Sequence, residues 1–137
     1  MTPGAPLPVE LQALAWSVML LFAHIGLQSG LMTLELGVPY NASPRDNQAE
    51  PRGVIAGRAA RAARNFMETY PAFVGLALAL VVSGRHGDMG SQGAIMWIVS
   101  RVVYLPLYLA GVPYIRTLVF SVSIWGLIRM FEQLLWG

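Results

Sequence analysis

The sequence contains no cysteine and no lysine, and each absence narrows the possible functions. Without cysteine, the chain can form no disulfide bond, no thiolate metal site and no cysteine nucleophile. Its positive charge comes from nine arginines, and the formal net charge is only +2. A charge so small and so scattered argues against nucleic-acid binding. The first ten residues carry no basic side chain, unlike the start of a secretory signal peptide.

Charge of either sign is scarce, whereas apolar residues are abundant. Charged residues make up 12% of the 137 residues and hydrophobic residues 55%, whereas a soluble domain has about 25% charged residues. A helix that spans a bilayer needs about 20 apolar residues, and four stretches are long enough. They predict helices at about 9–36, 57–83, 92–110 and 115–136. We therefore expect one all-α domain over 1–137, a four-helix transmembrane bundle with up-down-up-down topology.

The distribution of arginine predicts how this bundle is oriented. The expected first connection and the helix start after it contain most of the arginines, including Arg45 and Arg52, and the third connection is followed by Arg116. The second connection has only Arg85, and the N-terminal tail has none. By the positive-inside rule, the first and third connections are cytoplasmic and both termini lie outside.

The most unusual stretch runs from Arg58 to Phe73, where a polar stripe enters an apolar segment. Arg61, Arg64, Asn65 and Glu68 fall at i, i+3, i+4 and i+7, so they share one face of a helix. Charges in hydrocarbon cost several kcal/mol, and such residues face a bundle interior or a watery cavity. The stripe is therefore a candidate functional site.

A second polar set lies on the expected third and fourth helices. Arg101, Tyr104 and Tyr108 are at i, i+3 and i+7, again on one face, and Arg116 follows a short turn. Guanidinium groups bind carboxylates, a carboxylate binds an ammonium group, and a phenol or an arginine stabilises a thiolate. This inventory suits a small zwitterionic peptide such as glutathione, although the same groups would suit other small anions.

A structural network is the alternative interpretation of these residues. Arg64 and Glu68, at i and i+4, would neutralise each other inside the bundle, or Arg101 would pair with Glu68 to join two helices. Polar residues elsewhere have simpler interpretations. His24 is expected to pack or to form an interhelical hydrogen bond. Arg129 and Glu132 are expected to form an interfacial pair. Three tryptophans are either interface anchors or packing residues, and these are Trp97, Trp125 and Trp136.

Two motifs, in order, resemble the MAPEG family, the membrane-associated proteins of eicosanoid and glutathione metabolism. The first is Arg61-Ala62-x-x-Asn65-x-x-Glu68-x-x-Pro71-x-Phe73. The second is Arg101-x-x-Tyr104-x-x-x-Tyr108 followed by Arg116, and it is similar to the microsomal glutathione transferases. The loop Ser43-Pro44-Arg45-Asp46 and the later Gly57-Arg58-Ala59 resemble short bacterial members, which implies the bacterial inner membrane.

The resemblance implies a glutathione-dependent membrane transferase or peroxidase that acts on a hydrophobic electrophile. It also implies a homotrimer in contact with membrane lipid, with glutathione as co-substrate between neighbouring subunits at the cytoplasmic side. Arg116 would stabilise the glutathione thiolate, and Tyr104 would be the second catalytic residue. By position, the residues that bind glutathione would be Arg61, Arg64, Asn65, Glu68, Tyr104, Tyr108 and Arg116.

The sequence departs from the family pattern near the end of the first helix. Eicosanoid enzymes have a basic residue there, whereas the stretch from Gln28 to Leu36 contains Glu35 and no arginine. An alternative function is therefore a non-catalytic MAPEG-fold protein that uses its polar network for assembly or for binding a lipid or partner. A transport function is disfavoured because the sequence shows no internal repeat.

Overall fold

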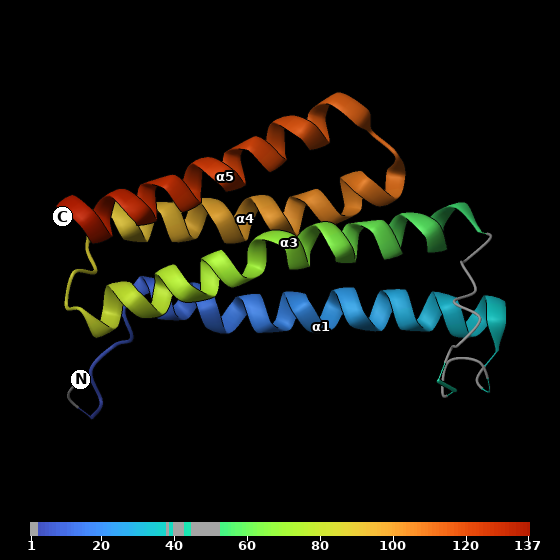
Figure 1. The fold of residues 1–137 in the computed structure, drawn as a ribbon, viewed down its shortest axis with the longest axis horizontal. Coiled ribbons are helices and arrows are strands. Elements are labelled where there is room, and N and C mark those ends of the chain that lie inside the picture. The colour runs from blue at the N-terminus through green and yellow to red at the C-terminus, as the bar shows by residue number, and fades with distance from the viewer. Residues whose placement is uncertain (1–2, 38, 40–42, 45–52) are drawn as a thin grey trace.

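The computed structural model of the chain describes residues 3–37, 39, 43–44 and 53–137. In these ranges it contains four long helices, α1 (Val9–Leu36), α3 (Val54–Val82), α4 (Asp88–Ala110) and α5 (Pro113–Trp136). Each helix is long and apolar enough to cross a membrane. The helices alternate in direction, and both termini lie at one end of the bundle together with the second connection (Figure 1). The predicted all-α four-helix membrane bundle is confirmed.

Helix α3 begins earlier than the predicted start at residue 57, because its first turn has a distant partner. The backbone N–H of Gly53, which precedes the helix, donates a hydrogen bond of 2.8 Å to Oε1 of Glu35 at the end of α1. A carboxylate at a helix N-terminus also interacts favourably with the helix dipole. Glu35 therefore joins the ends of α1 and α3. The loop residues Arg45, Asp46 and Arg52 lie outside the described residues.

Helix α4 also begins before its predicted start at residue 92. The polar turn between α3 and α4 is therefore shorter than predicted. A carboxylate from α1 binds the start of this helix. Oε1 of the buried Glu10 accepts hydrogen bonds from the Gly87 N–H at 3.3 Å and from the Ser91 hydroxyl at 3.4 Å. Helix α5 begins at Pro113, a residue favoured in the first turn of a helix.

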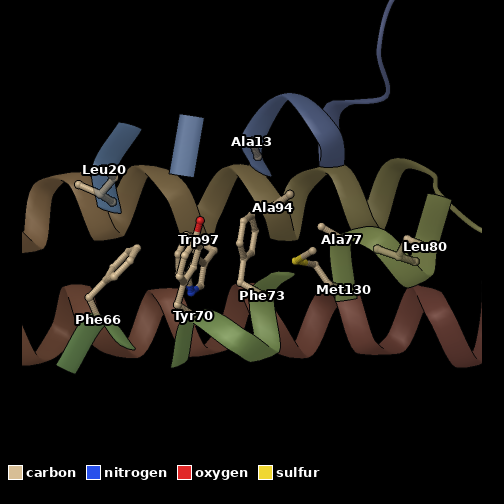
Figure 2. Packing of buried hydrophobic residues seen from close by; sticks show 10 residues of the cluster. All are labelled: Ala13, Leu20, Phe66, Tyr70, Phe73, Ala77, Leu80, Ala94, Trp97 and Met130. Carbon is tan, nitrogen blue, oxygen red and sulfur yellow. The ribbon is translucent and has the colours of Figure 1, made fainter. Parts of the chain in front are cut away.

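An aromatic cluster from α3 and α4 forms the centre of the bundle (Figure 2). The rings of Phe73 and Trp97 stack with their centroids 3.9 Å apart and their planes 6° apart. Tyr70 stacks on Trp97 at 5.9 Å, and Phe66 lies 4.6 Å from Tyr70. The Tyr70 hydroxyl lies 3.0 Å from the Ser17 hydroxyl of α1. The cluster thus fixes the rotation of α3, and thereby the direction in which its polar stripe points.

Trp97 has no exposed surface and is therefore a packing residue, whereas Trp125 and Trp136 are 50% and 73% exposed. Trp136 ends α5 and so fits the role of an interface anchor, whereas Trp125 lies in the middle of this helix and would contact lipid chains.

Helices α4 and α5 are in closest contact near the end that carries the termini. A Cβ added to Gly126 of α5 would lie 2.6 Å from the carbonyl oxygen of Gly93 of α4. Small residues of this kind allow two membrane helices to approach closely. Towards their connection the two helices diverge (Figure 1). Their divergent end is where the candidate site lies.

Candidate functional site

A hollow of about 260 Å³ lies between α3, α4 and the start of α5. Four of the seven predicted site residues line it, and they come from three different helices. Thr117 and Phe120 complete the lining, and Phe120, four positions after Arg116, is on the same side of α5. The predicted residues brought together here are Asn65, Tyr104, Tyr108 and Arg116.

Arg101 lies beside this hollow and is fully buried. Its Nη1 donates a hydrogen bond of 2.7 Å to Oδ1 of Asn65. The guanidinium carbon lies 4.5 Å from the ring centroid of Tyr104, and the rings of Phe66 and Phe120 are at 5.5 and 5.9 Å. Arg101 forms no ion pair within the described part of the chain. A buried cation without a carboxylate partner favours an anion nearby.

A second cation stands at the other side of the hollow. The guanidinium carbon of Arg116 lies 4.6 Å from the ring centroid of Tyr108, and the rings of Tyr104 and Tyr108 are 5.6 Å apart. Arg116 is in the first turn of α5, where the helix dipole is also positive. Among the residues that the structure describes, Arg116 forms no ion pair. We call Arg101, Tyr104, Tyr108 and Arg116 the arginine–tyrosine row.

Not all of the predicted site residues reach this hollow. Arg64 and Glu68 line a different groove of about 650 Å³ between α1 and α3. Arg61 lines neither cavity: its side chain is exposed, and its guanidinium lies beside Gly57. The polar stripe of α3 is therefore a ridge, with the hollow on one flank and the groove on the other.

The ion pairs proposed by the structural alternative are not formed within the described ranges. Arg64 and Glu68 are both exposed and do not pair, and Arg101 bonds to Asn65 rather than to Glu68. The described residues also hold no cluster of three side chains that would ligate a metal ion. What the arrangement offers is two cations, two phenols and an amide around a space that suits a small anion.

The sequence groups Arg101 with Tyr104 and Tyr108, and the structure places it beside the hollow, whereas nothing in the sequence connects His24 with the site. Arg101 shares the helical face of Tyr104, so its spacing is the signal that indicates its position beside the hollow. His24, which was predicted to pack or to form an interhelical hydrogen bond, stacks on Phe66 of α3 and has no hydrogen-bond partner among the described residues. It also lines the groove together with Arg64 and Glu68. In the sequence, His24 is recognisable only as a polar residue within an apolar run. That pattern does not indicate which helix the side chain contacts.

The chain was compared with known proteins. A model of the MAPEG family matches residues 13–136, nearly the whole chain. No curated protein and no solved structure matched. The match covers α1 from residue 13 onward, the whole of α3, α4 and α5, and every residue of the hollow and the groove. The chain therefore belongs to the MAPEG family.

Proposed function

We propose that the protein is a glutathione-dependent transferase or peroxidase that acts on a hydrophobic electrophile from the membrane. The arginine–tyrosine row carries this proposal. Two guanidinium groups without ion-pair partners in the described part of the chain flank a small hollow, with the rings of two tyrosines between them. Such a site favours a compact anion that also accepts hydrogen bonds, and a glutathione thiolate is such an anion.

In this proposal Arg116 acts through its charge alone. An arginine stays protonated at any relevant pH, so it is not a base. A positive charge within about 4–6 Å of a thiol lowers the thiol pKa by ~1–3 units. Tyr104 would donate a hydrogen bond to the same sulfur. Because the thiolate is the nucleophile, both contacts raise the reactive fraction of bound glutathione at neutral pH.

The chemistry needs no other cofactor. The thiol proton passes to water. The thiolate sulfur then bonds to the electrophilic carbon of the second substrate, which releases its leaving group as an anion or, in an addition to a conjugated double bond, takes a proton from water at the adjoining carbon. With a hydroperoxide, the sulfur attacks the terminal oxygen and releases an alcohol. A second glutathione then converts the sulfenic acid to a disulfide and water. Both reactions start from the same bound thiolate.

We also propose that the protein is a homotrimer in the bacterial inner membrane, with its first and third connections in the cytoplasm. The exposed ridge of α3 supports assembly. Arg61, Arg64 and Glu68 are exposed on a helix that spans the membrane, and lipid contact with these charges would cost several kcal/mol. A neighbouring subunit would cover them and leave the apolar outer surface to membrane lipid.

The same ridge supports the second candidate function. A MAPEG-fold protein without catalysis would use these charges for assembly or for binding a lipid or partner, and the hollow would then hold no thiolate. The two functions differ in one observable, the ionisation of bound glutathione.

Glutathione binding to the purified protein in mild detergent tests the proposal. Calorimetry should show binding, and the ultraviolet absorbance of a thiolate should appear on addition of glutathione at neutral pH. S-methylglutathione, which has no ionisable thiol, is the matched control and should give no such absorbance. Binding without a thiolate signal would favour the non-catalytic function. Native mass spectrometry should show mainly trimers, and a predominance of monomers would contradict the assembly.

A further inference from the structure

One arginine near the start of α3 binds the C-terminal end of α4. Arg58 is half-buried, and its Nη1 donates a hydrogen bond of 3.0 Å to the carbonyl oxygen of Leu109. The last carbonyl groups of a helix have no partner within the helix. Those of Leu107 and Tyr108 accept hydrogen bonds of 3.1 and 3.0 Å from the turn that follows, and Arg58 supplies the donor for the next one. A cation at this end of a helix also interacts favourably with the helix dipole.

The guanidinium group of Arg58 also lies against the turn between α4 and α5. This turn consists of two residues, Gly111 and Val112. Gly111 has a φ of 75°, in the left-handed region that favours glycine at a helix end. A Cβ added to Gly111 would lie 2.7 Å from Cζ and Nη2 of Arg58. The missing side chain at Gly111 therefore leaves the space that the guanidinium occupies.

This contact lies in the part of the bundle where α4 and α5 constrain each other least. The two helices are in close contact at Gly93 and Gly126, and they diverge towards the turn (Figure 1). Helix α4 also contains Pro106, which has no N–H to bond to the carbonyl four residues earlier. The segment after Pro106 is therefore held less firmly by its own helix. Arg58 links the end of this segment to α3.

Two members of the arginine–tyrosine row lie on either side of the linked turn. Tyr108 immediately precedes Leu109, and Arg116 is in the first turn of α5, three residues after Pro113. The position of the turn therefore sets the distance between the Arg116 guanidinium and a sulfur in the hollow. The interaction of two charges falls with the inverse of their separation, so an increase from about 4 to about 6 Å weakens it by about a third.

We propose that Arg58 is a positioning residue that acts through Arg116. By binding the Leu109 carbonyl, Arg58 fixes the turn between α4 and α5 and thereby holds the Arg116 guanidinium at the hollow. Without this link the turn moves, Arg116 stands further from the sulfur, and the pKa of bound glutathione rises. Arg58 is not one of the described residues that line the hollow, so its effect is indirect. This inference rests on the proposed function, because that function supplies the thiolate.

The test compares two arginines that each bind the C-terminal end of a helix. Arg58→Ala removes the donor to Leu109, whereas Arg58→Lys keeps a charged donor on a long side chain. Arg85→Ala is the matched control, because Arg85 donates a hydrogen bond of 3.3 Å to the Leu134 carbonyl near the end of α5, at the opposite end of the bundle. The thiolate absorbance of bound glutathione, followed against pH in detergent, gives the pH at which half of it is ionised.

We expect Arg58→Ala to raise this pH by about 0.3–1 units and to lower turnover at neutral pH about two- to tenfold, a third of the logarithmic effect of losing the charge of Arg116. Arg58→Lys should stay within about twofold of the wild type. Arg85→Ala removes the same kind of hydrogen bond and should leave the ionisation of glutathione unchanged. If Arg58→Ala loses stability but keeps the wild-type ionisation, the inference is overturned, because Arg58 then only caps α4.

A second variant disturbs the same contact from the side of the turn. A methyl group at Gly111 would displace the Arg58 guanidinium and leave its charge in the protein. Because the positive φ also strains an alanine, Gly111→Ala is compared in the wild type and in Arg58→Ala. It should raise the pH of half-ionisation in the wild type and do so clearly less in Arg58→Ala. Equal shifts in both backgrounds would contradict the inference, because the two residues would then act independently.

Hydrogen exchange tests the link without a ligand. In Arg58→Ala, the amides of the turn and of the first turn of α5 should exchange faster than in the wild type, whereas in Arg85→Ala they should not. Unchanged exchange in Arg58→Ala would overturn the inference. A wild type that forms no thiolate would contradict the proposed function, and the role of Arg58 would fail with it. A thiolate whose ionisation does not depend on Arg58 would contradict this inference alone.

Discussion

The two ends of the bundle use the same types of polar residue in different ways. At the end that carries the termini, polar side chains satisfy one another. Arg129 Nη1 lies 3.5 Å from Glu132 Oε2, as predicted, and its Nη2 donates to Gln92 Oε1 at 3.3 Å. Arg85 donates to the Leu134 carbonyl oxygen, also at 3.3 Å. At the opposite end, Arg101 and Arg116 have no carboxylate partner in the described part of the chain.

The carboxylates show the same difference. Glu10, at the end that carries the termini, is 1% exposed, and its Oε1 accepts two hydrogen bonds at the start of α4. Glu68, in the middle of α3, is exposed and forms no ion pair among the described residues. A carboxylate that accepts hydrogen bonds from another helix contributes to stability, whereas an exposed one without an ion pair is available to a ligand. We therefore expect mutations of the hydrogen-bonded side chains at the terminal end to change stability, and mutations of Arg116 and Glu68 to change binding and turnover.

The largest effect is expected for Arg116→Ala. Loss of its charge should raise the pKa of bound glutathione by ~1–3 units, so the thiolate fraction below that pKa should fall roughly 10- to 1000-fold. Turnover should fall with the thiolate fraction, and the pH at which half of the bound glutathione is ionised should rise. Glutathione affinity should stay close to that of the wild type. Turnover at several pH values and the thiolate absorbance check this.

The matched control is Arg129→Ala, which removes an arginine from the other end of the same helix. It should leave turnover and the thiolate signal unchanged. Equal losses of turnover in both variants would show that the effect of Arg116 is not local. That result would contradict its proposed electrostatic role.

The second prediction concerns Glu10, at the end that carries the termini. Glu10→Ala should lower the free energy of unfolding by about 1–3 kcal/mol, because the donors of Gly87 and Ser91 lose their acceptor. Glu10→Gln keeps an oxygen at the same place and should lower the free energy of unfolding by less than Glu10→Ala does. Glutathione affinity should be unchanged in both. Thermal unfolding in detergent, together with calorimetry, measures these effects, and a loss of binding without a loss of stability would contradict the division between the two ends.

The fold was predictable from the sequence because a membrane helix is specified by local hydropathy. The starts of α3 and α4 were not, because Glu35 and Glu10 bind them from far away in the sequence. The sequence periodicity correctly predicted that Arg64, Asn65 and Glu68 share one face of α3. It did not show that this face is a ridge between two cavities, because that depends on how Phe66 and Tyr70 pack against α1 and α4.

The third prediction concerns the carboxylate on this ridge. Glu68→Gln keeps the shape of the side chain and removes its charge, so glutathione affinity should fall about fivefold, the difference between a charged and a neutral hydrogen bond. Stability should be equal or higher, because a charge is removed from a membrane span. Calorimetry and thermal unfolding are again the measurements. An unchanged glutathione affinity in Glu68→Gln would show that this carboxylate does not bind the ligand.

The smallest effect is expected for Glu132→Gln, which breaks the pair with Arg129. The two side chains are 30% and 32% exposed, and a pair so open to solvent contributes only about 0–1 kcal/mol. Arg129 also keeps its hydrogen bond to Gln92. Thermal unfolding should therefore change little, and glutathione affinity should not change at all. Since Glu132→Gln and Glu68→Gln are the same chemical change, a similar loss of affinity in both would show that the ends of the bundle do not differ in the way proposed. A loss confined to Glu68→Gln would show that an unpaired carboxylate, and not a carboxylate as such, is what binds the ligand.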